Sequence, residues 1–200
     1  MAIDPKDVYR LREETGAGMM DCKRALEEAT GDFTKARELI KKKGLEKADM
    51  IAQKGGDVKE GRIGAYIHST GKVAAMVELT CQTDFVAKGD DFQELLKEFA
   101  VAVAAFSPLV VSKDQLDPKL VEEEKAKYAN DVKGKPPEIA AKILEGKMEK
   151  NLYSQKCLLS MPYPKEDKFK GTYGDYLKSK VGNIKENIIL RRFVRMELGK

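Results

Sequence analysis

The chain has 200 residues, 42% hydrophobic and 35% charged, which suits a soluble globular protein with one sizeable core or two smaller ones. It contains no apolar run of about 18 residues, so we expect no membrane-spanning helix, and residues 1–5 carry no signal- or transit-peptide pattern. Three dispersed cysteines and one histidine argue against a disulfide framework, a zinc site and a usual catalytic triad, and indicate a reducing compartment.

The net charge of +4 is unevenly distributed, because residues 135–200 carry fifteen Lys and Arg against eight Asp and Glu. A basic segment of this kind is one feature of RNA- and ribosome-binding proteins. The alternative is the solvated side of lysine-rich helices. We favour this alternative, since the charges come with no RNA-binding motif and no interleaving of arginine with aromatic residues.

The first 50 residues are predicted to form three short helices. The first is capped by Asp4 and ends at residues 15–18, where two glycines permit a sharp turn. The second has apolar residues at helical spacing from Cys22 onward. The third begins after Asp32 and is predicted to end at Gly44. A bundle this small has a thin core, so we expect it to gain stability from a partner or a neighbouring domain.

A hairpin is predicted after a linker at residues 54–57. Residues 63–68 and 73–81 alternate apolar with other side chains on either side of a turn at residues 69–72. The alternation predicts one apolar face, made of Ile63, Ala65, Ile67, Val73, Ala75, Val77, Leu79 and Cys81.

Helices dominate the rest of the chain. One is predicted over residues 91–106, and Asp117 caps another. After a turn at residues 133–137, a long helix running to about residue 159 should pack antiparallel against its predecessor as a helical hairpin.

The chain is predicted to end in a short helix at residues 173–181 and a third strand at residues 188–198, with Arg192 interrupting its apolar face. The predicted fold class is therefore α+β. A three-helix domain at residues 1–53 precedes a core domain at residues 54–200, with a small antiparallel sheet and packed helices that include the helical hairpin.

Two stretches closely resemble the signatures of the elongation factor Ts family: residues 11–26, LREETGAGMMDCKRAL, and residues 81–88, CQTDFVAK. They stand in the order and spacing that the family uses. The resemblance continues through residues 146–148, 157–159 and 191–195 and covers essentially the whole chain. The resemblance implies a ubiquitin-associated-like N-terminal domain and an α+β core. It also implies nucleotide exchange on elongation factor Tu, bound in its GDP-loaded and nucleotide-free forms, by a homodimer of the short, single-core form of the family.

The resemblance also implies the site. Asp84 and Phe85 would form a tip that enters the partner beside its magnesium ion, with Thr83 and Val86 shaping the base of that tip. The N-terminal domain would grip the GTPase through residues on its first two helices, namely Leu11, Arg12, Met19 and Met20. Exchange is a matter of differential binding, so no catalytic residue, metal or cofactor is expected.

The residues alone leave alternatives open. Without the resemblance, residues 83–86 would be the end of a strand, with Asp84 in a turn and Phe85 in the core. Met19 and Met20 would be helix core, and Arg12 a solvated charge. Met161 also stands where the family usually has glutamine, which puts any contact of that glutamine in doubt.

Three other functions compete with exchange. The N-terminal helices could recognise ubiquitin, although such an adaptor has no use for the sequence at residues 83–86. The basic segment could bind RNA, and Asp84, Asp90 and Asp91 could serve an enzyme, although no base, nucleophile or metal-ligand spacing accompanies them. We expect no direct nucleic-acid or membrane contact. The expected compartment is the bacterial cytoplasm, or an organelle matrix or stroma if a transit peptide was removed.

Overall fold

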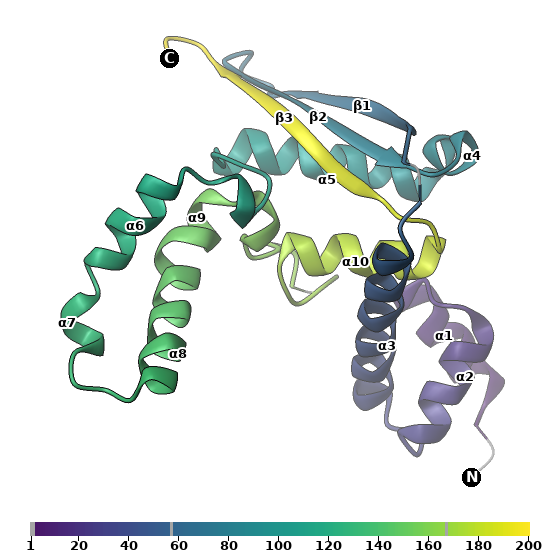
Figure 1. Cartoon of the computed structure of the whole chain (residues 1–200). Helices are drawn as coiled ribbons and strands as arrows, with labels where there is room; N and C mark the ends of the chain where they lie inside the picture. Colours follow the sequence, from purple (N-terminus) through teal and green to yellow (C-terminus); the bar gives the residue numbers. More distant parts are fainter. Residues whose placement is uncertain (1–2, 57, 167) are drawn as a thin grey trace.

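The computed structural model describes residues 3–56, 58–166 and 168–200, and the predicted α+β class is confirmed. A three-stranded sheet lies on a long helix, and two helical parts extend from this centre on opposite sides (Figure 1). One is the N-terminal bundle and the other is a helical hairpin. The tip sequence lies on the bundle's side of the molecule, at α4 (Asp84–Lys88).

The N-terminal bundle consists of α1 (Pro5–Thr15), α2 (Met19–Glu28) and α3 (Phe33–Lys54). The predicted caps are present, because the Asp4 carboxylate accepts from the Lys6 amide and that of Asp32 accepts from the Thr34 and Lys35 amides. Gly16 ends α1 with a φ of 67°, a left-handed conformation that favours glycine. The bundle has its own buried cluster, made of Val8, Leu11, Ala17, Cys22, Ala25, Leu26, Ala29 and Ala36.

The prediction that the third helix ends at Gly44 is wrong, since α3 continues to Lys54. Its second half packs against α10 (Tyr173–Ile184), where Gly182 lies directly on Gly44. A Cβ atom built on Gly182 would be 2.5 Å from the Gly44 carbonyl oxygen. Gly44 therefore marks a close approach of two helices, and the packing outweighs the low helix propensity of glycine.

The sheet contains β1 (Glu60–Ile67), β2 (Val73–Cys81) and β3 (Ile189–Glu197), in that order and antiparallel. Helix α5 (Asp90–Phe106) covers one face. The buried face of β2 is the predicted one, and Gly64 of β1 lies so close to α5 that an added Cβ would be 3.0 Å from Leu96. The central cluster is formed mainly by this face and by α5, whose buried residues are Phe92, Leu95, Leu96, Phe99, Ala100, Ala102, Val103 and Ala104.

The predicted apolar face of the hairpin is wrong for β1. The register pairs Gly64 with Val77 and Tyr66 with Ala75, so these small and aromatic residues take the buried side. The predicted core residues Ile63, Ala65 and Ile67 consequently lie on the opposite, exposed face. The sequence period was correct, but both faces of β1 are apolar enough for either to have been chosen.

Strand β3 contains a β-bulge that alternation did not predict. Glu78 pairs with Arg192, but the next residue, Leu79, pairs with Leu190, so Arg191 is the extra residue. Because of this extra residue, the apolar side chains after the bulge lie on the opposite face of the sheet from those before it. Ile188 and Leu190 are therefore buried, whereas Val194, Met196 and Leu198 are exposed.

The helical hairpin is confirmed. Its first limb contains α6 (Pro118–Ala126), capped by Asp117, and α7 (Ala129–Val132). Its second limb contains α8 (Pro137–Met148), a π-helical turn (Glu149–Tyr153) and α9 (Ser154–Lys156), three residues short of the predicted end. Short 3-10 turns flank it (Lys113–Gln115 and Leu158–Ser160). The limbs lie side by side (Figure 1) over a small cluster of Leu116, Met148, Leu152 and Cys157.

Candidate partner-binding site

The tip is a single helical turn, α4, between β2 and α5. Thr83 is its N-cap, and the Thr83 hydroxyl accepts a hydrogen bond from the Val86 amide at 3.3 Å. Phe85 is 83% exposed, which contradicts the interpretation of residues 83–86 as a strand end with Phe85 in the core. A large apolar side chain held this far into solvent on an ordered turn is a candidate contact for a partner.

The base of the tip is anchored in the central core. Ala87 is 3% exposed, and Val86 is half-buried against the central cluster. The Gln93 side-chain amide donates to the Ala87 carbonyl oxygen at 2.7 Å. Within this one turn, Val86 and Ala87 face the core, whereas Asp84 and Phe85 face solvent.

Asp84 carries the charge of the tip. Its carboxylate accepts a hydrogen bond from the Lys88 ammonium at 2.6 Å, one turn later in the same helix. This hydrogen bond, with the favourable charge interaction of the same pair, lowers the pKa of Asp84 below its usual value. Both side chains are mostly exposed, so the pair contributes little to stability. The tip therefore presents the Asp84 carboxylate, paired with Lys88, beside the exposed ring of Phe85.

Glu186 contacts the tip from a distant part of the sequence. It lies between α10 and β3, and its carboxylate accepts from both the amide and the hydroxyl of Thr83, at 3.0 and 2.7 Å. Sequence reasoning missed this residue. No local pattern could have found it, because 103 residues separate the two partners and only the fold brings them together.

The four N-terminal site residues do not share one surface. Met20 is 62% exposed and Arg12 is exposed, whereas Met19 is half-buried against the bundle. Leu11 has no exposed surface, so a role for it in partner binding would be indirect, through the packing of α1. Met19 therefore fits the interpretation as helix core in part, whereas Met20 is exposed and available for contact with a partner.

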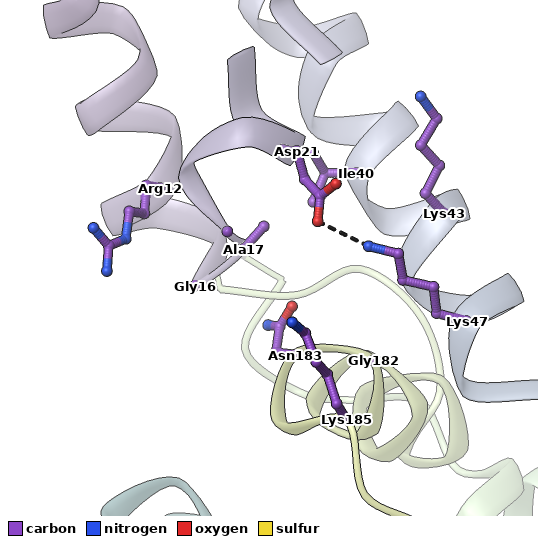
Figure 2. Close-up of a pocket in the computed structure, with 12 residues that line it drawn as sticks. Arg12, Gly16, Ala17, Asp21, Ile40, Lys43, Lys47, Gly182, Asn183 and Lys185 are labelled. Carbon is purple, nitrogen blue, oxygen red and sulfur yellow. Dashed lines mark hydrogen bonds and ion pairs between the residues drawn. The ribbon is translucent and has the colours of Figure 1, made fainter. Parts of the chain in front are cut away.

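A pocket of about 220 Å³ lies where the bundle meets α10 (Figure 2). The Lys47 ammonium donates to the Asp21 carboxylate at 2.8 Å across it, and this hydrogen bond is the main reason why the pKa of Asp21 is lowered. The side-chain amide of Asn183 donates to the Thr15 carbonyl oxygen at 3.2 Å, which ties the end of α10 to the end of α1. Arg12 points away from the pair (Figure 2) and toward solvent.

The described ranges 3–56, 58–166 and 168–200 contain no group of three or more His, Cys, Asp and Glu placed to hold a metal ion. The same ranges contain no helix long and apolar enough to cross a membrane. Cys22, Cys81 and Cys157 are buried free thiols. Burial raises the pKa of the Cys157 thiol to about 11, so it stays protonated near neutral pH.

Known proteins that are similar to this chain include several named Elongation factor Ts. The family model described as Elongation factor TS matches residues 27–170, which include the tip. A protein from Nitratidesulfovibrio vulgaris named Elongation factor Ts is 46% identical over 201 residues, which cover 100% of this chain and 98% of that protein. Proteins of the same name from Fervidobacterium nodosum and Thermodesulfovibrio yellowstonii are 45% and 43% identical over 100% of this chain, and over 100% and 98% of their own lengths.

Proposed function

The chain belongs to the elongation factor Ts family, and from this we propose that it is a guanine-nucleotide exchange factor for elongation factor Tu in translation elongation. It would bind the GDP-loaded GTPase, promote release of GDP, and leave the nucleotide site open for GTP. The observation that carries this proposal is the tip, which presents Phe85, 83% exposed, from a base fixed in the core.

The proposed mechanism needs binding energy alone. A GTPase holds GDP through contacts to its phosphates and through a magnesium ion that neutralises their charge. A protein that binds the nucleotide-free state more tightly must weaken GDP binding by the same factor, because coupling between two ligands is reciprocal. The chain then needs no nucleophile, metal or cofactor of its own, and we propose that it is not an enzyme.

Within this mechanism Phe85 is the wedge. It would enter the partner beside the magnesium site and displace the segments that support the ion. Asp84, ionised and adjacent, would disturb the hydrogen bonds of magnesium-bound water or orient the wedge. Thr83 and Val86 would fix the turn from below, as their positions at the cap and the base of α4 suggest.

The N-terminal bundle would provide a second contact, a grip on the nucleotide-binding domain of the GTPase. Met20 and Arg12 offer exposed apolar and cationic surface for this, and methionine adapts well to a partner's shape. Met19 and Leu11 would support that surface from inside the bundle. We retain the division into an N-terminal domain at residues 1–53 and a core domain at residues 54–200 as part of this proposal.

We further propose a homodimer formed through the exposed face of the sheet. The register aligns Ala65, Met76 and Val194 across the three strands, and it aligns Ile67, Ala74 and Met196 in the same way. The face is apolar, and its charges cancel where Arg192 pairs with Glu78 at 2.6 Å. An apolar, locally neutral surface is complementary to a copy of itself, so a second copy of this chain is its proposed occupant.

Sedimentation equilibrium tests the dimer. Wild type should sediment as a dimer, and Val194→Glu should sediment as a monomer because it buries a charge in the interface. Leu109→Glu, an exposed leucine on a loop outside the sheet, is the matched control and should remain dimeric. A monomeric wild type at micromolar concentration would remove the homodimer from the proposal.

The exchange function is tested by comparing affinities for two states of elongation factor Tu. We expect the chain to bind the nucleotide-free GTPase at least about a hundredfold more tightly than the GDP-loaded one, in the upper range of typical couplings. Isothermal titration with and without excess GDP measures both affinities. Equal affinity for the two states would exclude exchange, and tight binding to bare RNA or to ubiquitin instead would favour the competing functions. The cytoplasm remains the proposed compartment, where the buried thiols stay reduced.

A further inference from the structure

We propose that Glu186 is a positioning residue, which fixes the tip in its working orientation by holding Thr83. Its carboxylate is bidentate, since one oxygen accepts from the Thr83 amide at 3.0 Å and the other from the Thr83 hydroxyl at 2.7 Å. Hydrogen bonds to an ionised group are stronger than those between neutral groups, and two parallel bonds also fix direction. The kinetic part of this proposal rests on the proposed exchange function, and its structural part does not.

The carboxylate also determines which way the Thr83 hydroxyl points. An ionised carboxylate can only accept, so the hydroxyl hydrogen must be directed toward Glu186. An oxygen lone pair is then left for the Val86 amide, whose nitrogen is 3.3 Å from the hydroxyl oxygen. Glu186 thus orients the N-cap of α4. The helix has only five residues and cannot hold its shape without such tertiary contacts.

The remaining polar group of Thr83 is held as well. Its carbonyl oxygen accepts from the Cys81 thiol at 3.1 Å and from the Ala87 amide at 3.2 Å. Burial raises the pKa of the Cys81 thiol, and the neighbouring charge of Glu186 acts in the same direction, so the thiol keeps the proton that it donates. Every polar group of Thr83 is therefore engaged, and the orientation of Phe85 two residues later follows from it.

The helix that precedes Glu186 is joined to the N-terminal bundle. In the last turn of α10, the Asn183 side-chain amide donates to the Thr15 carbonyl oxygen at 3.2 Å. In the loop that follows, Glu186 holds Thr83, and the Asn187 amide donates to the Gln82 side chain at 3.4 Å. The end of α10 and the short loop after it therefore connect the end of α1 to the tip, and Glu186 is the charged contact on the tip side.

The structural part of the proposal is tested by amide hydrogen exchange, measured by NMR on the full chain. Glutamine at position 186 keeps the shape of the side chain but removes its charge and one of its two acceptor oxygens, so it cannot accept from Thr83 through two charge-assisted hydrogen bonds. In Glu186→Gln the Thr83 and Val86 amides should exchange about tenfold faster, while the amides of β2 are unchanged. The matched control is Glu94→Gln, which makes the same substitution away from the tip, at an exposed glutamate that pairs with Lys180. Unchanged protection of both tip amides would overturn the proposal.

The kinetic part is tested by GDP release from elongation factor Tu over a range of concentrations of this chain. Glu186→Gln should lower the maximal release rate about tenfold, whereas the half-saturating concentration stays within about twofold because the N-terminal grip is unaltered. Thr83→Val removes the hydroxyl and should match Glu186→Gln, whereas Thr83→Ser keeps the hydroxyl and should retain a higher release rate than Thr83→Val. If Glu186 only stabilised the fold, the release rates of all these variants would instead fall in proportion to the decrease in their melting temperatures.

The outcomes separate the two proposals. Wild-type release rates for Glu186→Gln, together with a slow Phe85→Ala, would leave the exchange function and overturn the positioning role. Failure of wild type itself to accelerate release would sink the exchange function, and the amide protection would still decide whether Glu186 holds the tip.

Discussion

The contact between α3 and α10 allows a stability prediction with a built-in control. Gly182 of α10 is buried, and a Cβ atom there would be 2.5 Å from the Gly44 carbonyl oxygen and 3.1 Å from its carbonyl carbon. Both are backbone atoms, so no flexible side chain can give way. Alanine at position 182 must therefore push the two helices apart by roughly 1 Å or bend one of them.

The cost follows from two opposing terms. Overpacking costs about 1–3 kcal/mol, and about 2–3 kcal/mol applies here because the contacting atoms are backbone atoms that cannot give way. Replacing glycine by alanine inside a helix returns about 1 kcal/mol. Gly182→Ala should therefore lower the free energy of unfolding by about 1–2 kcal/mol, and lower Tm by roughly 2–4 °C for each kcal/mol. Urea denaturation followed by circular dichroism measures the change.

Gly44→Ala is the matched control from the other side of the same contact. A Cβ atom on Gly44 meets nothing within 4 Å, so this variant should gain about 1 kcal/mol from helix propensity alone. The two substitutions are chemically identical, but they should change the free energy of unfolding in opposite directions. Wild-type stability of Gly182→Ala, or a larger loss for Gly44→Ala, would refute the close helix approach as the reason why α3 continues through Gly44.

Three further predictions concern the cores and the tip. Leu26→Ala, at a leucine that is 1% exposed in the bundle, should cost about 2–5 kcal/mol, and amide exchange should locate the loss in α1 and α2; a loss spread evenly over the chain would contradict a separate bundle core. Cys157 should resist a thiol reagent at pH 8 in the folded chain and react after unfolding, because burial raises its pKa to about 11; rapid labelling of the native chain would argue against that burial. Asp84 should titrate with a pKa below its usual value of 3.8, and Lys88→Met should move that pKa back toward 3.8. The stabilising effect of the pair is present above the usual pKa and is lost as the pH falls through the lowered pKa. An identical pKa of Asp84 in both chains would exclude the Asp84–Lys88 contact.

Much of the fold could be predicted from local sequence. The caps at Asp4, Asp32 and Asp117, the hairpin turn and the helical hairpin each depend on residues close together in the chain. Local chemistry determines such features, so they can be predicted from one sequence. The buried face of β2 was also predictable, because only one of its faces is continuously apolar.

The features that the sequence did not predict depend on contacts between distant residues. Gly44 signals a helix end until α10 is packed on it, and the bulge at Arg191 is visible only against the register of β2. The exposed face of β1 follows from the fit of Gly64 against Leu96. Alternation within one strand cannot say which of two apolar faces is buried.

The candidate site shows the same division. Family resemblance pointed to Asp84 and Phe85 as site residues, whereas the residues alone favoured a buried Phe85. In the structure the Phe85 ring is exposed, on a turn whose base is buried. Glu186 had no signal in the sequence, since a glutamate beside a helix end is ordinary until the fold places it on Thr83. Whether Phe85 and the N-terminal residues contact a GTPase stays a prediction.

The most direct measurement is the rate of release of fluorescent GDP from elongation factor Tu, with catalytic amounts of this chain and excess unlabelled nucleotide. We predict strong acceleration by wild type and loss of most of it in Phe85→Ala, at an unchanged melting temperature because the ring is 83% exposed. Phe106→Ala, at another exposed phenylalanine far from the tip along α5, is the matched control and should keep most of the activity. No acceleration by folded wild type would contradict the exchange function, and full acceleration by Phe85→Ala would contradict the wedge.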